Sequence, residues 1–188
     1  SELFCSRVVS RVHCHGCHKL FTNTNDLSSS IELPIVGNTL EQCISNFFDY
    51  EELDKDRICR NCKIRGNASK YSLLGERPIL ITSLKRFNAQ SQKISTKVTF
   101  PLENLSLHKL MKEKSNVCSR TQYSLFAVIN HFGRSSESGH YVLFMRSGKK
   151  WYKFNDEIIE EIRKESIVSS NAYTLIYIDS EKFEELGT

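Results

Sequence analysis

Two cysteine pairs place the strongest constraint on what this chain can fold into. Cys14 and Cys17 form one C-x2-C pair, and Cys59 and Cys62 form a second. Each pair occupies a turn-like segment in which two sulfur atoms can converge, and four thiolates complete the tetrahedral shell of zinc. A closed shell leaves no position for a substrate. We therefore expect one structural zinc ion that joins two segments distant in sequence.

Other interpretations of these cysteines remain open. They could be four unrelated core residues, or one of the histidines at 13, 15 and 18 could replace a cysteine as a ligand. A thioredoxin-like redox pair would begin a helix after a strand, which neither pair does. The total of seven cysteines is odd and argues against a disulfide framework. We therefore expect a reducing compartment, the cytoplasm or the nucleus.

Length and composition describe an ordinary globular chain. The 188 residues are 39% hydrophobic, enough for one domain with a core. The net charge of +4 comes from scattered basic residues, so we expect no nucleic-acid partner. The apolar runs are too short to span a membrane, and no signal peptide is visible. Because the chain begins at Ser1 without a methionine, we expect it to be part of a longer protein.

Hydrophobic patterning predicts mostly strands. The predicted α+β class has antiparallel pairing and a few short helices, one of which begins at Thr39 with Gln42 completing a capping box. A strand, a turn and a second strand are expected between residue 19 and Pro34, and a weak helix and polar loop over 104–117. The other predicted strands cover about 3–13, 68–75, 79–84, 98–101, 123–132, 140–147, 150–155 and 172–179, with a short helical piece near 164–169.

A histidine hairpin is the candidate catalytic feature. His140 follows a Gly/Ser-rich loop and begins one predicted strand, and Asn155 and Asp156 end the next. A hairpin of this length can place the amide or the carboxylate beside the imidazole, which is the base half of a nucleophilic catalytic unit. The alternatives are a structural histidine and an ordinary Asn-Asp turn at a strand end.

The motifs in their order resemble the ubiquitin-specific protease family of deubiquitinating cysteine proteases. The resemblance covers about residues 3–179 and implies a papain-like palm with an antiparallel sheet and a zinc-bearing fingers subdomain. It implies fingers in 1–75 and a palm in 76–188, which together make one incomplete catalytic domain. The motifs after the two C-x-x-C pairs are R-P-I-L-I-T-S-L-K-R-F, F-P-L, Y-S-L-F-A-V-I-N-H-F-G, S-G-H-Y, W-Y-K-F-N-D and A-Y-T-L-I-Y.

The resemblance also implies roles for individual residues. His140 matches the catalytic histidine, Asn155 the third catalytic position, and Asp156 the acidic residue after it. Loop 132–139 matches a loop that gates the channel for the tail of ubiquitin. The four paired cysteines match the zinc ligands. Ubiquitin and ubiquitinated proteins are the implied partners.

The chain departs from the family pattern at the nucleophile. Family members carry it in an N-terminal G-N-T-C segment, whereas here Leu40 follows Gly37-Asn38-Thr39. We interpret the next cysteine, Cys43, as a core residue on an apolar helix face. Cys5 and Cys118 have no helix N-terminus that would lower a thiol pKa. We therefore expect the nucleophile upstream of Ser1, in a thumb that another segment or another chain supplies.

Three function classes follow from these features. The first is a thiol isopeptidase that hydrolyses the bond between the C-terminal glycine of ubiquitin and a lysine of a protein or another ubiquitin, with this chain carrying the base half of the site. The second is a catalytically inactive ubiquitin-binding module, either a pseudo-protease or a fragment. The third, a zinc-ribbon nucleic-acid binder, leaves His140 and its hairpin unexplained.

Overall fold

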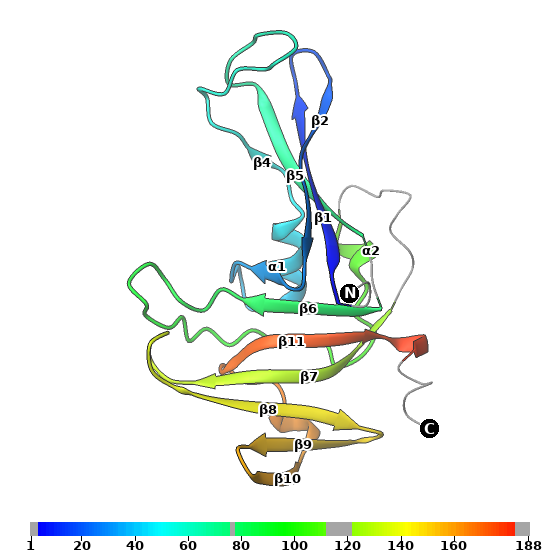
Figure 1. Cartoon of the computed structure of the whole chain (residues 1–188), viewed down its shortest axis with the longest axis vertical. Helices are drawn as coiled ribbons and strands as arrows, with labels where there is room; N and C mark the ends of the chain where they lie inside the picture. Colours follow the sequence, from blue (N-terminus) through cyan, green and yellow to red (C-terminus); the bar gives the residue numbers. More distant parts are fainter. Residues whose placement is uncertain (1–3, 76–77, 112–121, 183–188) are drawn as a thin grey trace.

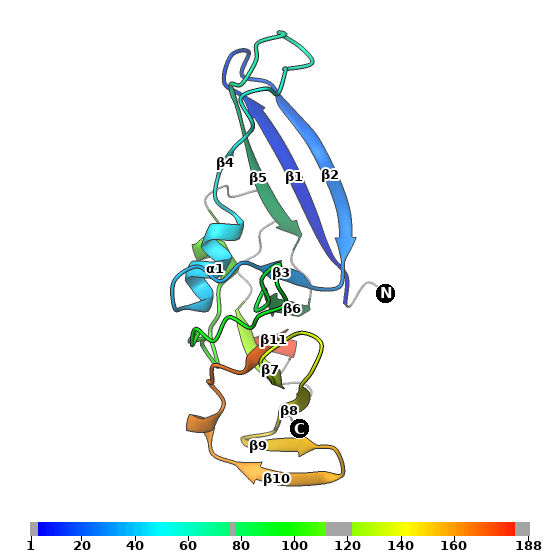
Figure 2. The same cartoon turned by 90° about the vertical axis from the view of Figure 1, so that its left-hand side faces the viewer.

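The molecule consists of two β-sheets, one of which projects from an edge of the other (Figure 1). The computed structural model describes residues 4–75, 78–111 and 122–182. A narrow four-stranded sheet stands on a broader seven-stranded sheet, so the molecule is elongated (Figure 1, Figure 2). The predicted α+β class with largely antiparallel pairing is confirmed.

The four-stranded sheet has the order β2-β1-β5-β4, and every pair in it is antiparallel. Because central strand β1 ends at Cys14 and β5 begins six residues after Cys62, the sheet carries both cysteine pairs at the same end. The strands are β1 (Ser6–Cys14), β2 (Leu20–Ser28), β4 (Glu51–Glu52) and β5 (Ala68–Gly75).

The seven-stranded sheet has the order β10-β9-β8-β7-β11-β6-β3. Strands β7 to β10 form a meander of consecutive hairpins, and the β3–β6 pair is parallel. The strands are β3 (Ile31–Leu33), β6 (Ile79–Leu84), β7 (Tyr123–Phe132), β8 (His140–Ser147), β9 (Lys150–Asn155), β10 (Ile158–Ile162) and β11 (Ala172–Asp179).

Helix α1 (Leu40–Phe47) closes the core on one face of this sheet. Thr39 Oγ1 accepts from the backbone N–H of Gln42, and Gln42 returns a side-chain bond to the Thr39 N–H, so the predicted capping box is present. The buried residues Leu40, Cys43 and Ile44 share a core with apolar side chains of the sheet. Strand β3 and helix α1 both precede residue 75 but pack with the seven-stranded sheet. The predicted division of the chain at residue 75 stays a prediction.

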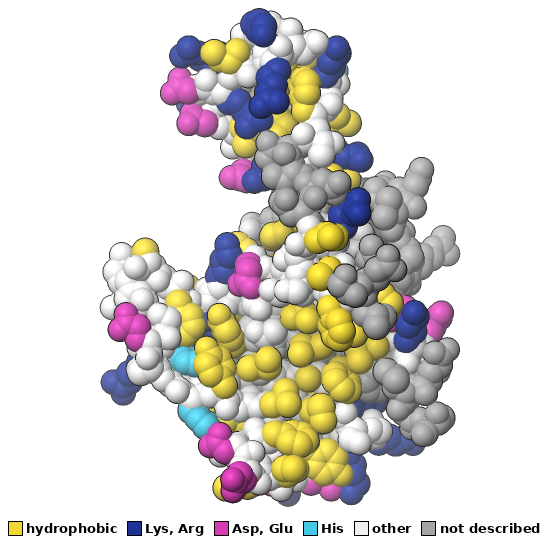
Figure 3. All heavy atoms as spheres, in the orientation of Figure 1, with side chains coloured by type: hydrophobic (Ala, Val, Ile, Leu, Met, Phe, Trp, Pro, Cys, Tyr) yellow, Lys and Arg dark blue, Asp and Glu magenta, His cyan; other side chains and the backbone are white. Residues whose placement is uncertain are grey.

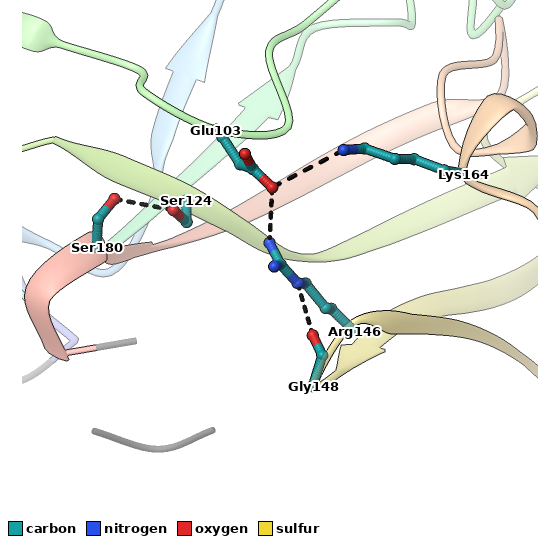
Figure 4. A network of polar contacts seen from close by, with 6 residues as sticks. All are labelled: Glu103, Ser124, Arg146, Gly148, Lys164 and Ser180. Carbon is teal, nitrogen blue, oxygen red and sulfur yellow. Dashed lines mark hydrogen bonds and ion pairs between the residues drawn. The ribbon is translucent and has the colours of Figure 1, made fainter. Parts of the chain in front are cut away.

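A polar network joins the C-terminal end of β8 to the connecting segments that contain Glu103 and Lys164. The Glu103 carboxylate accepts from Arg146 at 3.4 Å and lies 3.8 Å from the Lys164 ammonium. Figure 4 shows both side chains pointing toward this carboxylate. Arg146 also donates to the Gly148 carbonyl at 2.9 Å, and the Ser124 and Ser180 hydroxyls join β7 to the residue after β11. Exposed ion pairs of this kind contribute under about 1 kcal/mol each, so the network orients connections more than it stabilises the fold.

The structure refines the predicted elements in several details. Residues 98–101 form no strand, although Thr99 makes an isolated bridge to Thr39. The weak helix predicted at the start of 104–117 is present as the short helix α2 (Leu107–Leu110), and the polar loop predicted after it lies outside the described residues from 112 onward. Strand β10 was not predicted, and the helical piece near 164–169 is a single 3-10 turn, η1 (Lys164–Ser166). In the described part of the chain, no helix is long and apolar enough to cross a membrane.

Candidate active site and metal centre

The β7–β8 hairpin positions His140 at the first residue of β8, opposite Phe132. The loop that delivers it ends at Gly139, whose Cα lies against the ring of His131. A Cβ at Gly139 would sit 2.2 Å from His131 Nε2 and 2.8 Å from the Phe132 carbonyl oxygen. These distances are shorter than any real Cβ contact. Residue 139 must therefore be glycine for His140 to hold its present position.

The β9–β10 turn brings both predicted partners to His140. His140 Nε2 lies 2.5 Å from Asn155 Oδ1 at the end of β9, and 3.8 Å from Asp156 Oδ2. Asp156 occupies the left-handed region with φ +52°, which aspartate tolerates better than most residues. The geometry therefore makes Asn155 the direct partner and Asp156 a more distant carboxylate.

This arrangement can hold a proton acceptor in place. An amide oxygen accepts only, so the Nε2–H of neutral His140 donates to Asn155 Oδ1. The lone pair is then on Nδ1, which is free to accept a proton. The side chain of His140 is 48% exposed, so the ring can be reached from outside.

The four paired cysteines converge at the end of the four-stranded sheet. Cys14 Sγ lies 3.7 Å from Cys62 Sγ, Cys17 Sγ lies 3.8 Å from Cys59 Sγ, and all four sulfurs lie within 4.8 Å of one another. Sulfurs at about 2.3 Å from a central zinc ion in a tetrahedron are about 3.8 Å apart. The donor set and its spacing therefore fit a tetrahedral metal ion.

The two cysteine pairs share one backbone geometry. His18 and Lys63, each next after its pair, adopt positive φ and donate backbone bonds to Cys14 and Cys59 at 2.8 and 3.0 Å. The first cysteine of each pair in turn donates to the residue five positions later. Such matching knuckles present two sulfurs each to a common centre, so the sulfur positions follow from the backbone.

The thiols do not ionise independently. Backbone hydrogen bonding from Cys62, partly opposed by desolvation, lowers the pKa of Cys59 to about 6. At Cys62, hydrogen bonding from Ile64 favours the thiolate, but desolvation and the other three thiols outweigh it and raise its pKa to about 11. A first thiolate therefore forms readily at this centre. A bound cation would be needed to keep all four cysteines ionised as thiolates.

Comparison with known proteins decides the family. The profile described as "Ubiquitin carboxyl-terminal hydrolase" matches residues 1–177 of this chain. The chain belongs to this family. The resemblance that the sequence motifs indicated, to its ubiquitin-specific protease members, is thereby confirmed.

Two relatives show how much of a family member is present. Ubiquitin carboxyl-terminal hydrolase 20 of Arabidopsis thaliana is 31% identical over 182 residues, which are 94% of this chain and 26% of that protein. Ubiquitin carboxyl-terminal hydrolase 2 of Gallus gallus is 32% identical over 189 residues, again 94% of this chain and 52% of that protein. The chain thus spans about a quarter and about half of these relatives.

Solved structures agree with the fold. In the SAGA DUB module of Ubp8, Sgf11, Sus1 and Sgf73 bound to monoubiquitin, the matched chain is 27% identical, with a TM-score of 0.82. The match covers 95% of this chain and 41% of that one. The module bound to ubiquitin aldehyde matches with a TM-score of 0.80 and covers 42% of that chain. The predicted family fold, a palm sheet with a fingers subdomain, is confirmed.

Behind His140 lies an aromatic layer that sequence reasoning missed. His131 is buried, with its ring centroid 4.9 Å from that of Tyr141 and 5.3 Å from that of Phe87. Burial, assisted by the Lys93 charge, lowers the pKa of His131, so this second imidazole stays neutral. The ammonium of Lys93 donates to the His131 carbonyl and to Asn171 Oδ1. In the sequence, the signal that could have indicated this layer was the spacing of His131 from Gly133 and Gly139, the two glycines that lie against its ring.

The remaining cysteines are placed as follows. Cys43 is fully buried in α1, and its thiol donates to the Val36 carbonyl at 3.5 Å. Desolvation raises its pKa, opposite to what a nucleophile needs. Cys5 is half-buried just before β1, and the prediction for Cys118 lies outside the described residues. The structure thus places Cys43 in the core, as interpreted from its helical pattern.

Proposed function

We propose that this chain carries the base half of the active site of a thiol ubiquitin hydrolase. The observation that carries the proposal is the His140 Nε2–Asn155 Oδ1 pair, held at 2.5 Å in a hydrolase family member. The bond cleaved joins the C-terminal glycine of ubiquitin to a lysine of a protein or of another ubiquitin. Ubiquitin and ubiquitinated proteins are the partners.

In the proposed reaction, a cysteine thiol outside these residues attacks the glycine carbonyl carbon. His140 Nδ1 takes the thiol proton as the sulfur–carbon bond forms. It then gives that proton to the lysine nitrogen as the carbon–nitrogen bond breaks. Water, activated by His140 Nδ1, then hydrolyses the thioester and releases the ubiquitin carboxylate. Asn155 holds the ring in the tautomer that this sequence requires.

The open face of the palm sheet favours the proposal that a further segment, which carries the nucleophile, packs against it. Apolar side chains from five neighbouring strands line this face, and Figure 3 shows them as a broad yellow area over the sheet. An antiparallel sheet with one solvated face normally alternates apolar with polar residues, so this face is built to be covered. Its half-buried members are Ile79, Ile81, Phe126, Ile129, Leu143, Met145, Tyr152, Phe154 and Ile176.

We further propose that the four cysteines hold one zinc ion with a structural role. Four thiolates close its coordination shell, so its chemistry would be to fix the end of the fingers and not to activate water. The four free thiols also support a reducing location in the cytoplasm or the nucleus.

Hydrolysis of isopeptide-linked di-ubiquitin tests the proposal. We expect the complete natural protein to release monoubiquitin and the 188-residue chain alone to release none. Ubiquitin binding is measured in parallel by fluorescence anisotropy. Binding by the complete protein without hydrolysis would make it an inactive module. Hydrolysis by the 188-residue chain would mean that the nucleophile is one of its own seven cysteines.

A further inference from the structure

The end of the fingers contains a cavity that lies beside the metal centre and is lined by none of the residues of the His140 hairpin. Its volume is about 650 Å³, and it lies between the strand ends of β1, β2 and β5 and the segment 57–64, with one cysteine of each pair, Cys14 and Cys59, in its lining. Its walls include Leu20, Ile58 and Ile64, whose exposed fractions are 54%, 50% and 44%. Three aliphatic side chains this exposed around one hollow form a surface for a partner and not a protein core.

The rim of the cavity carries unneutralised positive charge. Arg57 and Arg60 both line it, and among the described residues neither guanidinium has an acidic partner. Nearby Arg65 is different, because it pairs with Asp56 at 3.3 Å. The two guanidinium groups therefore lie in the same cavity wall as the exposed aliphatic side chains.

The excess of positive charge extends over the whole tip. Segments 11–22 and 52–67 contain seven lysines and arginines and three acidic residues, Glu52, Asp54 and Asp56. Figure 3 shows several dark blue side chains at this end of the molecule, with magenta acidic side chains at its left edge. Four thiolates on one divalent cation would contribute two negative charges, which leaves the tip positive.

We propose that this cavity, with Arg57 and Arg60 on its rim, binds an acidic peptide segment of a partner protein through one large apolar side chain. The apolar side chain fills the hollow against Leu20, Ile58 and Ile64, and flanking carboxylates pair with the guanidinium groups. Five aliphatic side chains line the cavity against a single aromatic ring, that of Phe21. This lining suits a peptide anchor better than single-stranded nucleic acid, which is held by successive bases stacking on aromatic rings. The site is distinct from the His140 hairpin and recruits a partner by charge and shape.

Selection from a displayed library of random dodecapeptides against the 188-residue chain tests this site. We expect enriched sequences to carry several Asp or Glu around one Leu, Ile or Phe. A synthetic peptide of the consensus is then titrated by fluorescence anisotropy. The R57E/R60E variant should bind it at least about 10-fold more weakly, and Ile58→Ser should weaken it as well. Rising salt should weaken binding to the wild-type chain.

The matched control is K97E/K149E, which reverses the same number of charges at two exposed lysines of the palm and should bind like the wild type. Zinc content and thermal midpoint are measured for each variant, and R57Q/R60Q replaces any variant that fails to fold. The proposal is overturned if no sequence enriches, if the consensus lacks acidic residues, or if R57E/R60E binds as well as the wild type. The proposal is equally overturned if duplex DNA displaces the peptide and if Ile58→Ser leaves the binding of that DNA unaffected.

Discussion

At the residue scale, the position of His140 depends on a contact between two neighbours that do no chemistry. Gly139 leaves space for the ring of His131, which in turn packs on Tyr141 and Phe87. Tyr141 directly follows His140, and Gly139 directly precedes it. The aromatic layer under the strand and this glycine therefore both define where the His140 ring lies. A small change in this layer should therefore affect turnover before it affects folding.

Gly139→Ala tests that dependence. The new Cβ would lie 2.2 Å from His131 Nε2 and 2.8 Å from a backbone carbonyl, so the loop must move. Displacing a catalytic group by about 1 Å can cost about 100-fold in rate. We expect kcat for a ubiquitin reporter to fall by about that factor in the complete protein, with ubiquitin affinity little changed. Gly75→Ala is the control, since its Cβ would find its nearest contact at 3.6 Å; equal effects of the two changes would exclude this role for Gly139.

The two polar partners of His140 should differ in importance. Asn155 accepts directly at 2.5 Å, whereas the Asp156 carboxylate lies 3.8 Å away and alone can offset an imidazolium charge. We expect Asn155→Ala to lower kcat/KM by about 10- to 100-fold and Asp156→Asn by a smaller but measurable factor. Steady-state kinetics on the complete protein separate the two. Unchanged activity of Asp156→Asn would remove Asp156 from the proposed site.

At the element scale, the strands whose side chains enter the core were predictable and the peripheral ones were not. Strands β5 to β9 and β11 occupy the predicted ranges to the residue, because apolar stretches bounded by turn residues mark them. Strand β10 was missed because its residues are mostly exposed and it forms by pairing with β9. The parallel partner of β3 could not be read either, since pairing between distant segments leaves no local signal.

The candidate site divides in the same way. The cysteine pairs and the His140 hairpin are local motifs, so their members could be predicted to meet. Which of Asn155 and Asp156 lies closer to His140 depends on the turn conformation at Asp156, and the spacing of these residues in the sequence does not reveal that conformation. The tip cavity brings Leu20 next to Ile58 and Ile64, and only the folded sheet shows that contact.

Metal removal should loosen the fingers and leave the palm intact. We expect one zinc ion per chain by elemental analysis. A strong chelator, or Cys17→Ser, should speed amide hydrogen exchange in β1, β2 and β5 by more than about 10-fold. Exchange in β7 and β8 should stay unchanged, because these strands belong to the other sheet. Cys5→Ser is the control. Zinc-free protein with unaltered exchange in the fingers would contradict a structural role for the metal.

At the scale of the whole molecule, the two faces of the palm sheet are unequal. One face packs on α1 and holds the core, whereas the opposite face presents nine half-buried apolar side chains from five strands. Such a surface is unfavourable in water, so the isolated chain should associate through it. The same face would be covered by the nucleophile-bearing segment in the complete protein.

Leu143→Glu tests this view of the open face. Leu143 lies between Ile129 and Phe154 on adjacent strands, so a carboxylate there interrupts the apolar surface. In sedimentation velocity, we expect the 188-residue wild-type chain to self-associate and the variant to sediment as a monomer. In the complete protein, the same change should lower turnover by at least about 10-fold. Leu27→Glu, at a 64% exposed residue of the fingers, should do neither; a monomeric wild-type chain would argue against the covering role.

The measurement that tests the central claim most directly is kcat/KM of the complete protein for a fluorogenic ubiquitin C-terminal reporter, with and without His140. His140→Ala should lower kcat/KM by about 100-fold or more, and added imidazole should restore part of the rate. Ubiquitin affinity should stay close to that of the wild type, since the ring is proposed to transfer protons and not to grip the substrate. Turnover by His140→Ala equal to that of the wild type would contradict the assignment of the base half of the active site to this chain.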